Sequence, residues 1–310
     1  MRILITGGAG YLGTELVHAL ASRPDVEELV VYDNLSRGNH SLFIHRPLPS
    51  NVVRFVQADI LDQRRLRAEL VGIDVVYHLA AKVYTPFEPE DPHSFEQINH
   101  WGCSELASSV ESSDVSRLIF SSSTAVYGFT DSPATEETRC SPVTPYGIAK
   151  LRGEKQIARL AGRLSTYTLR CANIYGYSPA MRFDAVINRL MFEANFFNRV
   201  NIYSSGRQVR AFINVDRAVQ GLVFLLDGTA PPGVYNLVDD NFSVLDITMI
   251  AKELMPDLEF NFVDQHMPIG NLSVSPQTNL SALMPVQPVD LKADLTALAR
   301  KFAFSAVRGD

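Results

Sequence analysis

The chain has 310 residues, of which 46% are hydrophobic and 20% charged, and its formal net charge is -6. This length allows one large α/β unit or two joined domains, and the composition is that of a globular protein, which excludes a disordered tail or a fibre. The negative charge argues against a general nucleic-acid surface, because phosphate backbones are bound by an excess of Lys and Arg.

The amino terminus and the cysteines indicate a cytoplasmic protein. The sequence opens directly on the strand-like run 1–5, without the charged and apolar regions of a signal peptide, and no uninterrupted apolar run reaches ~18 residues. We therefore expect no membrane association. Cys103, Cys140 and Cys171 are too few and too scattered for a disulfide framework or a zinc site, so we expect reduced thiols and no metal.

Short apolar runs alternate with helical patterns over the first two-thirds of the chain. The runs are continuous, as buried parallel strands require, and they predict strands at 2–6, 29–32, 52–56, 74–79, 117–121 and 166–170. The first helix should begin near Leu12 and end before Pro24, and another should open near Pro145. This alternation predicts an α/β fold, a doubly wound parallel sheet of the Rossmann type.

The last third of the chain has a different pattern. Helices are indicated by Asp216 with the apolar positions that follow it and by the capping-box pattern Ser243 to Asp246, whereas 267–288 is rich in Pro, Asn, Ser and Gln and should be mostly loop. We expect a smaller C-terminal substrate-binding lobe from 172–209 and 238–310. The dinucleotide-binding domain should comprise 1–171 and returning segments at about 210–237.

A glycine-rich turn joins the first predicted strand to the first helix. Gly8, Gly10 and Gly13 fit the GxGxxG spacing, and Gly7, Gly10 and Gly13 fit the related GxxGxxG spacing. Such a turn lets the backbone approach a pyrophosphate and directs helix N-terminal amides at it. A tight turn without a ligand is the alternative. If the turn binds a cofactor, Tyr11 and Leu12, which lie between Gly10 and Gly13, are candidate cofactor-binding residues as well.

The second predicted strand is followed by Asp33, twenty positions after Gly13. An acid there accepts hydrogen bonds from the adenosine ribose and repels a 2′-phosphate, which favours NAD over NADP. Arg37 lies close by and could hold a 2′-phosphate, so NADP stays an alternative. Other candidate cofactor residues follow strands two to four or lie in the next helix, and each also has an ordinary structural interpretation: Asn34, Asp59, Ile60, Leu79, Ala80, Ala81, Lys82 and Asn99.

A phenol and an ammonium group, Tyr146 and Lys150, are four positions apart and so share one face of the helix that opens at Pro145. The cation stabilises a phenolate, so Tyr146 could act as a general acid or base. Hydroxyl residues, including Ser123 and Thr124, follow the fifth strand. Ligands bind beyond the carboxyl ends of parallel strands, so these groups should meet over one cofactor, although some of the serines can equally cap the strand end.

Together, the glycine turn, the run Asp33 to Asn39, the run Ser123 to Gly128 and the pair Tyr146 and Lys150 resemble the extended short-chain dehydrogenase/reductases. The resemblance is to the NAD-dependent nucleotide-sugar epimerase/dehydratase branch, with motifs similar to those of UDP-galactose 4-epimerase relatives. It implies that Ser123 contacts the substrate oxygen, that Tyr146 is the acid/base, and that Lys150 tunes Tyr146 and binds the nicotinamide ribose.

The same resemblance implies a nucleotide-sugar site. Asn173, in a stretch similar to the family's Leu-Arg-x-x-Asn-x-Tyr-Gly, should contact the phosphate, and Ser123, Thr124 and Arg182 are further candidate substrate-binding residues. Arg210 should bind the diphosphate, although without the family it would be a solvated arginine. The family's usual Arg-Pro-Gly-Asp is absent near Met267, which leaves the nucleotide open.

Epimerisation, dehydration and simple dehydrogenation all begin with the same oxidation of a sugar hydroxyl by Tyr146 and NAD. Related 4,6-dehydratases carry an Asp-Glu pair directly after the hydroxyl residue, whereas this chain has Thr124 and Ala125, which disfavours dehydration. Epimerisation, at C4, is the leading hypothesis, and a 4-dehydrogenase or 4-ketoreductase is the alternative. A reductase of small apolar ketones is disfavoured by Asp33 and Asn173.

A dinucleotide sensor without catalysis is the non-enzymatic alternative, and it is disfavoured because such relatives typically lose the tyrosine or the lysine. The resemblance also implies a homodimer, formed through the helix that carries Tyr146 and the preceding helix at 95–109.

Overall fold

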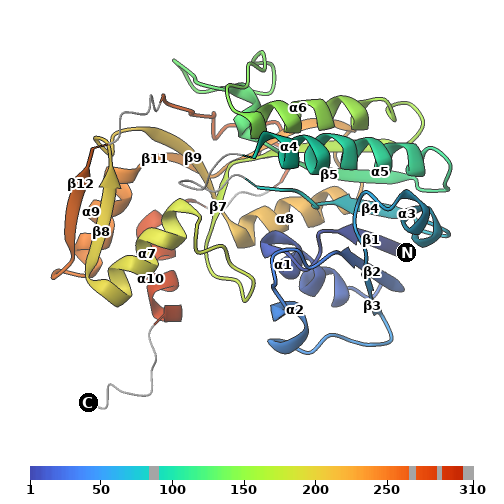
Figure 1. Cartoon of the computed structure of the whole chain (residues 1–310), viewed down its shortest axis with the longest axis horizontal. Helices are drawn as coiled ribbons and strands as arrows, with labels where there is room; N and C mark the ends of the chain where they lie inside the picture. Colours follow the sequence, from blue (N-terminus) through green and yellow to red (C-terminus); the bar gives the residue numbers. More distant parts are fainter. Residues whose placement is uncertain (84–90, 265–269, 285–287, 303–310) are drawn as a thin grey trace.

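The computed structural model describes residues 1–83, 91–264, 270–284 and 288–302 (Figure 1). A seven-stranded parallel sheet forms its core, in the order β10-β6-β5-β4-β1-β2-β3. The strands of this sheet are β1 (Arg2–Thr6), β2 (Glu28–Asp33), β3 (Val53–Gln57), β4 (Val75–His78), β5 (Arg117–Ser123), β6 (Ser165–Cys171) and β10 (Gly233–Leu237). This confirms the predicted Rossmann-type α/β fold. All six predicted strands are present with ends displaced by at most two residues, whereas β10 was not predicted.

Helices cover both faces of the sheet because its buried strands carry apolar side chains on both sides. In β1, Ile3 and Ile5 belong to a core shared with α1 (Tyr11–Ala21) and α8 (Val215–Leu226), whereas Leu4 belongs to a second core. The second core is shared with α3 (Gln63–Glu69), α5 (Gly102–Val110) and α6 (Pro145–Ala158). Figure 1 shows α5 and α6 on one side of the sheet and α1 and α8 on the other.

Two of the predicted helix starts are set by local chemistry. The Thr144 hydroxyl accepts a hydrogen bond from the Gly147 amide at 3.1 Å, and Pro145 occupies the first helical position of α6, where no amide proton is needed. The capping box predicted at Ser243 and Asp246 is present at the start of α9 (Val244–Leu254).

Short helices connect several strands on the way to the site. They are α2 (Ser41–Ile44), α4 (Pro92–Phe95), the π-helix η1 (Glu96–Trp101) and the 3₁₀ helix η2 (Thr124–Tyr127). A π-helix is rare and usually local, and η1 joins α4 to α5 directly.

A smaller lobe, on the left in Figure 1, contains two more sheets. One has the order β11-β9-β7, formed by β11 (Asp240–Ser243), β9 (Val209–Asn214) and β7 (Asn173–Tyr175), and the other pairs β12 (Glu259–Val263) with β8 (Arg199–Tyr203). The helices α7 (Val186–Phe197), α9 and α10 (Leu291–Phe302) pack against one another there. Within 267–288, the described part 270–284 forms turns and isolated bridges, while 267–269 and 285–287 lie outside the described residues.

The segment 210–237 is divided between the two parts of the fold. α8 and β10 pack with the large sheet, whereas β9 pairs in the small sheet. None of the described helices combines the length and the apolar character needed to cross a membrane. Cys103, Cys140 and Cys171 are all free thiols.

Candidate active site

A cavity of about 1370 Å³ lies between the carboxyl ends of the large sheet and the smaller lobe. A single drug-sized ligand occupies a pocket of ~300–1,000 Å³, so this cavity has room for a dinucleotide and a second molecule. Most of the sequence-predicted site residues line it: Gly7, Gly10, Tyr11, Leu12, Gly13, Asp33, Asn34, Ile60, Leu79, Ala80, Ala81, Lys82, Ser123, Thr124, Tyr146, Lys150, Asn173, Arg182 and Arg210.

The glycine turn forms one wall of the cavity, and its geometry requires glycine. Gly7 has φ +72°, and a Cβ atom on it would lie 2.5 Å from the Ala80 amide nitrogen; a Cβ on Gly13 would lie 2.3 Å from the Gly7 carbonyl oxygen. Gly10 is the N-cap of α1 and contributes no side chain, so the first amides of the helix face an open approach. Gly8 packs against Val31 instead of lining the cavity, which favours the GxxGxxG reading.

Asp33 stands at the end of β2, beside this turn. Its carboxylate accepts a hydrogen bond from the Ala9 amide at 3.0 Å and another from the Leu35 amide at 2.8 Å. Burial raises its pKa above the usual value, and these two backbone hydrogen bonds act in the opposite direction. A carboxylate has about four acceptor positions, so Asp33 keeps capacity for two ribose hydroxyls.

Two expected cofactor residues, Asp59 and Asn99, are not among the cavity-lining residues. The Asp59 carboxylate accepts a hydrogen bond from the side chain of Asn34 at 2.8 Å. The buried Asn99 amide, within the π-helix, accepts from the Lys82 amide nitrogen at 2.9 Å and donates to the Lys82 carbonyl at 2.8 Å. Each therefore fixes a residue that does line the cavity, Asn34 or Lys82.

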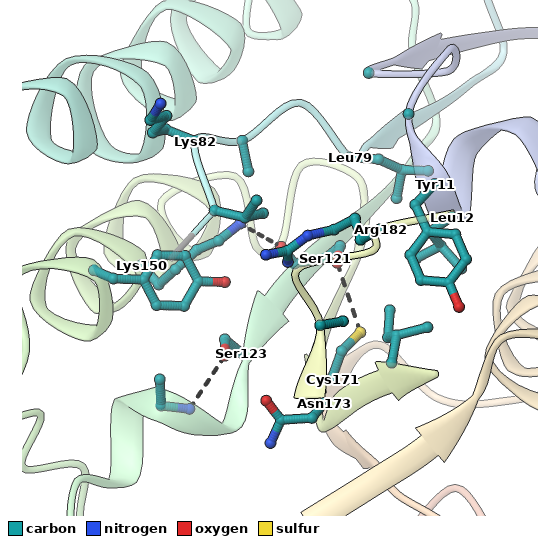
Figure 2. A pocket seen from close by; sticks show the side chains of 18 of the residues that line it. Tyr11, Leu12, Leu79, Lys82, Ser121, Ser123, Lys150, Cys171, Asn173 and Arg182 are labelled. Atoms are coloured by element: carbon teal, nitrogen blue, oxygen red, sulfur yellow. Dashed lines mark hydrogen bonds between the residues drawn. The ribbon is translucent and has the colours of Figure 1, made fainter. Parts of the chain in front are cut away.

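The predicted catalytic groups come from β5 and α6, and Figure 2 shows Ser123 and Lys150 in the cavity. Lys150 is 3% exposed as a residue, and its ammonium donates to the Ser121 carbonyl at 2.8 Å and lies over the Phe120 ring. The Ser123 hydroxyl accepts a hydrogen bond from the Ala125 amide at 3.2 Å. Its own hydroxyl proton is therefore free to be donated to a substrate oxygen.

Tyr146 lies in the first turn of α6 and lines the same cavity. Its ring makes an edge contact with Phe95, with centroids 5.8 Å apart. The next residue, Gly147, lies so close to η2 that a Cβ would be 2.6 Å from the Ala125 carbonyl oxygen. This close approach brings the start of α6 against the turn that follows Ser123.

A buried ion pair behind these groups was not predicted from the sequence. Glu154 and Arg170 form two hydrogen bonds, at 3.1 and 2.8 Å, and both side chains are less than a tenth exposed. Ser122 donates to Glu154 at 2.5 Å, and Arg170 donates to the Tyr127 hydroxyl at 3.1 Å. The pair thus links β6 and α6 to both ends of the segment that contains Ser123. The i,i+4 spacing of Lys150 and Glu154 was a possible signal.

A second buried group, His78, ends β4 directly before the lining residues Leu79 and Ala80. Its ring nitrogens lie 2.7 Å from the Thr6 hydroxyl and 3.2 Å from the Cys103 sulfur. Burial, with a smaller contribution from the charge of Lys150, lowers the pKa of His78 from 6.5 to about 3. The ring is therefore neutral and structural.

The predicted substrate residues approach from β7, β9 and the segment before α7. Asn173 donates to the Ala211 carbonyl at 2.9 Å. The Arg210 guanidinium donates to the Gly270 carbonyl at 2.6 Å, and that of Arg182 forms an ion pair with Asp184 at 2.5 Å. Figure 2 shows Arg182 and Asn173 around the same cavity as Ser123 and Lys150. The family's Arg-Pro-Gly-Asp motif, which this chain lacks, would be expected near Met267. Residues 265–269 lie outside the described residues.

Sequence reasoning missed one part of the cavity wall. Asn201 and Tyr203 of β8, Gln208 beyond it and Arg189 of α7 all line the cavity. The buried and exposed positions of β8 alternate. This alternation was the available signal for a strand, but it does not reveal which cavity the strand borders.

A model of the NAD dependent epimerase/dehydratase family matches residues 3–237, which is most of the large sheet, its helices and the cavity wall. The chain belongs to this family. The assignment confirms the resemblance seen in the motifs, and it identifies the protein as an NAD-dependent enzyme of the extended short-chain dehydrogenase type.

Individual relatives have different reactions. The chain is 30% identical to a UDP-glucose 4-epimerase of Mycolicibacterium smegmatis over 237 residues, covering 72% of each chain. It is 25% identical to human dTDP-D-glucose 4,6-dehydratase over 259 residues, covering 82% of this chain and 73% of the other. Among solved structures, it is similar to a UDP-glucuronic acid 4-epimerase of Bacillus cereus in complex with a fluorinated UDP-glucuronic acid and NAD. That similarity has a TM-score of 0.84 at 26% identity and covers 97% of this chain and 98% of the other.

Proposed function

We propose that this family member is a nucleotide-sugar epimerase that transiently oxidises a sugar hydroxyl, at C4. The choice among the family's reactions rests on which carboxylates line the cavity. Among the described residues that line the cavity, Asp33 is the only carboxylate, and it stands beside the glycine turn. Dehydration needs an additional acid near the sugar carbons, whereas oxidation followed by reduction needs only one acid/base and a hydride carrier.

The cavity suits NAD in the position that the glycine turn indicates. The first amides of α1 would bind the pyrophosphate, Asp33 the adenosine ribose, and Lys150 the nicotinamide ribose. The small side chains of Ala80 and Ala81 leave room for the ring. When bound, NAD supplies the acceptor, and later the donor, of the hydride. In this proposal the dinucleotide-binding domain is 1–171 with α8 and β10.

The residues of the chain then handle the proton and the orientation of the sugar. Tyr146 removes the proton from the hydroxyl, and the Lys150 ammonium stabilises the phenolate. The Ser123 hydroxyl donates its proton to the substrate oxygen, while one of its two lone pairs accepts from the Ala125 amide. After the keto sugar rotates in the site, Tyr146 returns the proton to the C4 oxygen, and the hydride returns to the opposite face of C4. A hydrogen bond to the Ser121 carbonyl holds the Lys150 ammonium in position for this role.

The second part of the cavity would bind a nucleotide diphosphate and its sugar. Arg182, Arg189 and Arg210 line this part, and guanidinium groups bind pairs of phosphate oxygens well. Asn173, at the start of β7, lines the same cavity. UDP-glucose and UDP-glucuronic acid appear in the names of similar proteins. A UDP-linked sugar is therefore the first substrate to test.

We also propose a homodimer formed through α5 and α6. Trp101, directly before α5, is 56% exposed, and Ile148 of α6 is 38% exposed. Large apolar side chains on two neighbouring helices favour burial against a second copy. Size-exclusion chromatography with light scattering tests this assembly.

The decisive assay incubates the purified protein with UDP-, dTDP- and GDP-sugars and identifies the products by NMR. A 4-epimer without net formation of NADH supports the proposal. A keto sugar with stoichiometric NADH would instead indicate the 4-dehydrogenase or 4-ketoreductase, and a product that has lost water would indicate a dehydratase.

The acid/base assignment has its own test. Tyr146→Phe should lower kcat by about 100-fold or more, the usual contribution of a positioned acid/base, while NADH binds with an unchanged Kd. Tyr177→Phe, at a tyrosine that does not line the cavity, is the matched control and should keep full turnover. Turnover of Tyr146→Phe within a few-fold of the wild type would remove Tyr146 from this role.

A further inference from the structure

Asp184 is held by two arginines that come from different parts of the fold. Its carboxylate pairs with Arg182 through two nitrogens, at 3.2 and 2.5 Å, and with Arg37 at 3.7 Å. Arg182 precedes α7, whereas Arg37 belongs to the loop after β2. The carboxylate therefore joins the loop beside the adenosine end of the cavity to the smaller lobe.

The loop that carries Arg37 has a defined shape. Leu35 adopts a left-handed φ of 57°, its amide donates to Asp33, and its carbonyl accepts from the Gly38 amide at 2.9 Å. This tight turn directs Arg37 back to the cavity, which it lines four residues after Asp33. A 2′-phosphate on a ribose held by Asp33 would lie within reach of such a side chain.

The segment that bears Asp184 is fixed as well. The buried Asn188 donates to the Arg182 carbonyl at 3.0 Å and to the Tyr11 hydroxyl at 3.3 Å, and its own oxygen accepts from the Gly176 amide at 2.9 Å. Asn188 thus ties the segment that bears Asp184 to the first residue of α1. Because both loops are held, the Asp184 carboxylate faces Arg37 without needing a ligand to bring them together.

A 2′-phosphate carries up to two negative charges, and Asp33 repels it. Binding of NADP would then need a nearby cation, and Arg37 is the one that the loop supplies at the adenosine end. Asp184 competes for that cation and already neutralises part of its charge. We propose that Asp184 is a determinant of dinucleotide specificity, which favours NAD over NADP by withholding Arg37 from a 2′-phosphate.

This inference rests on the proposed placement of the cofactor. It resolves an alternative that the sequence leaves open, namely whether Arg37 makes the site suitable for NADP. The Arg37 side chain of the ion pair with Asp184 is 50% exposed, and water screens such a pair. We therefore expect a modest effect on dinucleotide affinity. Asp184→Asn should lower the ratio of the NADPH Kd to the NADH Kd by about fivefold, with NADH affinity unchanged within about twofold.

The test is a double-mutant cycle read by NADH and NADPH fluorescence titration at low salt. The proteins are the wild type, Asp184→Asn, Arg37→Gln and the double variant. If Asp184 acts through Arg37, the gain in NADPH affinity disappears in the double variant. Glu253→Gln, which removes the carboxylate from the exposed pair with Lys292, makes the same change in net charge and should leave the ratio unchanged.

Two results would overturn the inference. One is an unchanged ratio in Asp184→Asn, and the other is an equal gain with or without Arg37, which would assign the effect to Arg182. Arg37→Gln alone gives an independent check if Asp184→Asn is unstable: Arg37 is already held, so NADPH affinity should change by less than about twofold, and a larger loss contradicts the proposal. Failure of the wild type to bind NADH would instead contradict the cofactor placement itself.

Discussion

His78 is neutral inside the folded protein at pH values where an exposed histidine is protonated. Its folded-state pKa is about 3, against 6.5 for a histidine in water, because burial removes the charged form from water and Lys150 repels it. Between these two values the unfolded chain binds one more proton than the folded chain. The stability that follows from the neutral ring is therefore complete above pH 6.5 and is lost progressively as the pH falls toward 3.

The magnitude follows from the linkage relation. Each pH unit inside this window is worth about 1.4 kcal/mol, so lowering the pH from 7.5 to 5 should cost the fold about 2 kcal/mol through this residue alone. His78→Gln removes the titration and keeps a polar group for the Thr6 hydroxyl. Guanidinium unfolding of both proteins at the two pH values measures the difference. The wild type should lose about 2 kcal/mol more than the variant.

A matched control separates this effect from general acid sensitivity. His40 is exposed in the structure, so His40→Gln replaces a histidine that meets water in both states and should lose as much stability as the wild type. If His78→Gln also lost as much as the wild type between pH 7.5 and 5, the ring would not be the source of the pH dependence, and the reasoning from burial would be refuted.

Three further predictions concern the turn, the buried ion pair and the substrate end of the cavity. Gly13→Ala should abolish the stabilisation by NADH in a thermal-shift assay, because the new methyl group would overlap the Gly7 carbonyl; retained stabilisation contradicts this. Glu154→Gln should lower the unfolding free energy by about 3–5 kcal/mol in urea, whereas adding Arg170→Met should restore part of it. Arg210→Gln should raise the KM for the nucleotide sugar about tenfold and leave the NADH Kd unchanged, and an equal effect on both would place Arg210 elsewhere.

Much of the large sheet could be predicted because its strands are buried on both faces. The run 2–6 has three consecutive buried apolar residues, Ile3 to Ile5, between Arg2 and Thr6, and the observed β1 has the same bounds. β10 was missed because Gly233 to Leu237 is short, lies far along the chain from β6, and begins with two exposed residues. Its assignment depends on a pairing with β6 that no local pattern encodes.

The site was predictable where its residues follow strand ends in a fixed order. Ser123, Tyr146 and Lys150 do line one cavity, as do Gly7, Gly10 and Gly13 of the glycine turn. The exceptions follow from side-chain direction: Asp59 turns toward Asn34, and Asn99 turns toward the backbone of Lys82. The wall formed by β8 depends on how the smaller lobe meets the sheet, and this information lies in long-range packing.

The late position of β10 also has a consequence for how the protein is made. The chain leaves the sheet after Cys171 and returns at Gly233, with α7, β8, β9 and α8 in between. Until residues 172–237 emerge from the ribosome, β6 is an unpaired edge that carries Tyr167 and Leu169. Unpaired edges promote aggregation, and parallel pairings across long chain separations form slowly. A fragment that ends at 171 should therefore associate with itself, so the cofactor half and the substrate half must fold as one unit.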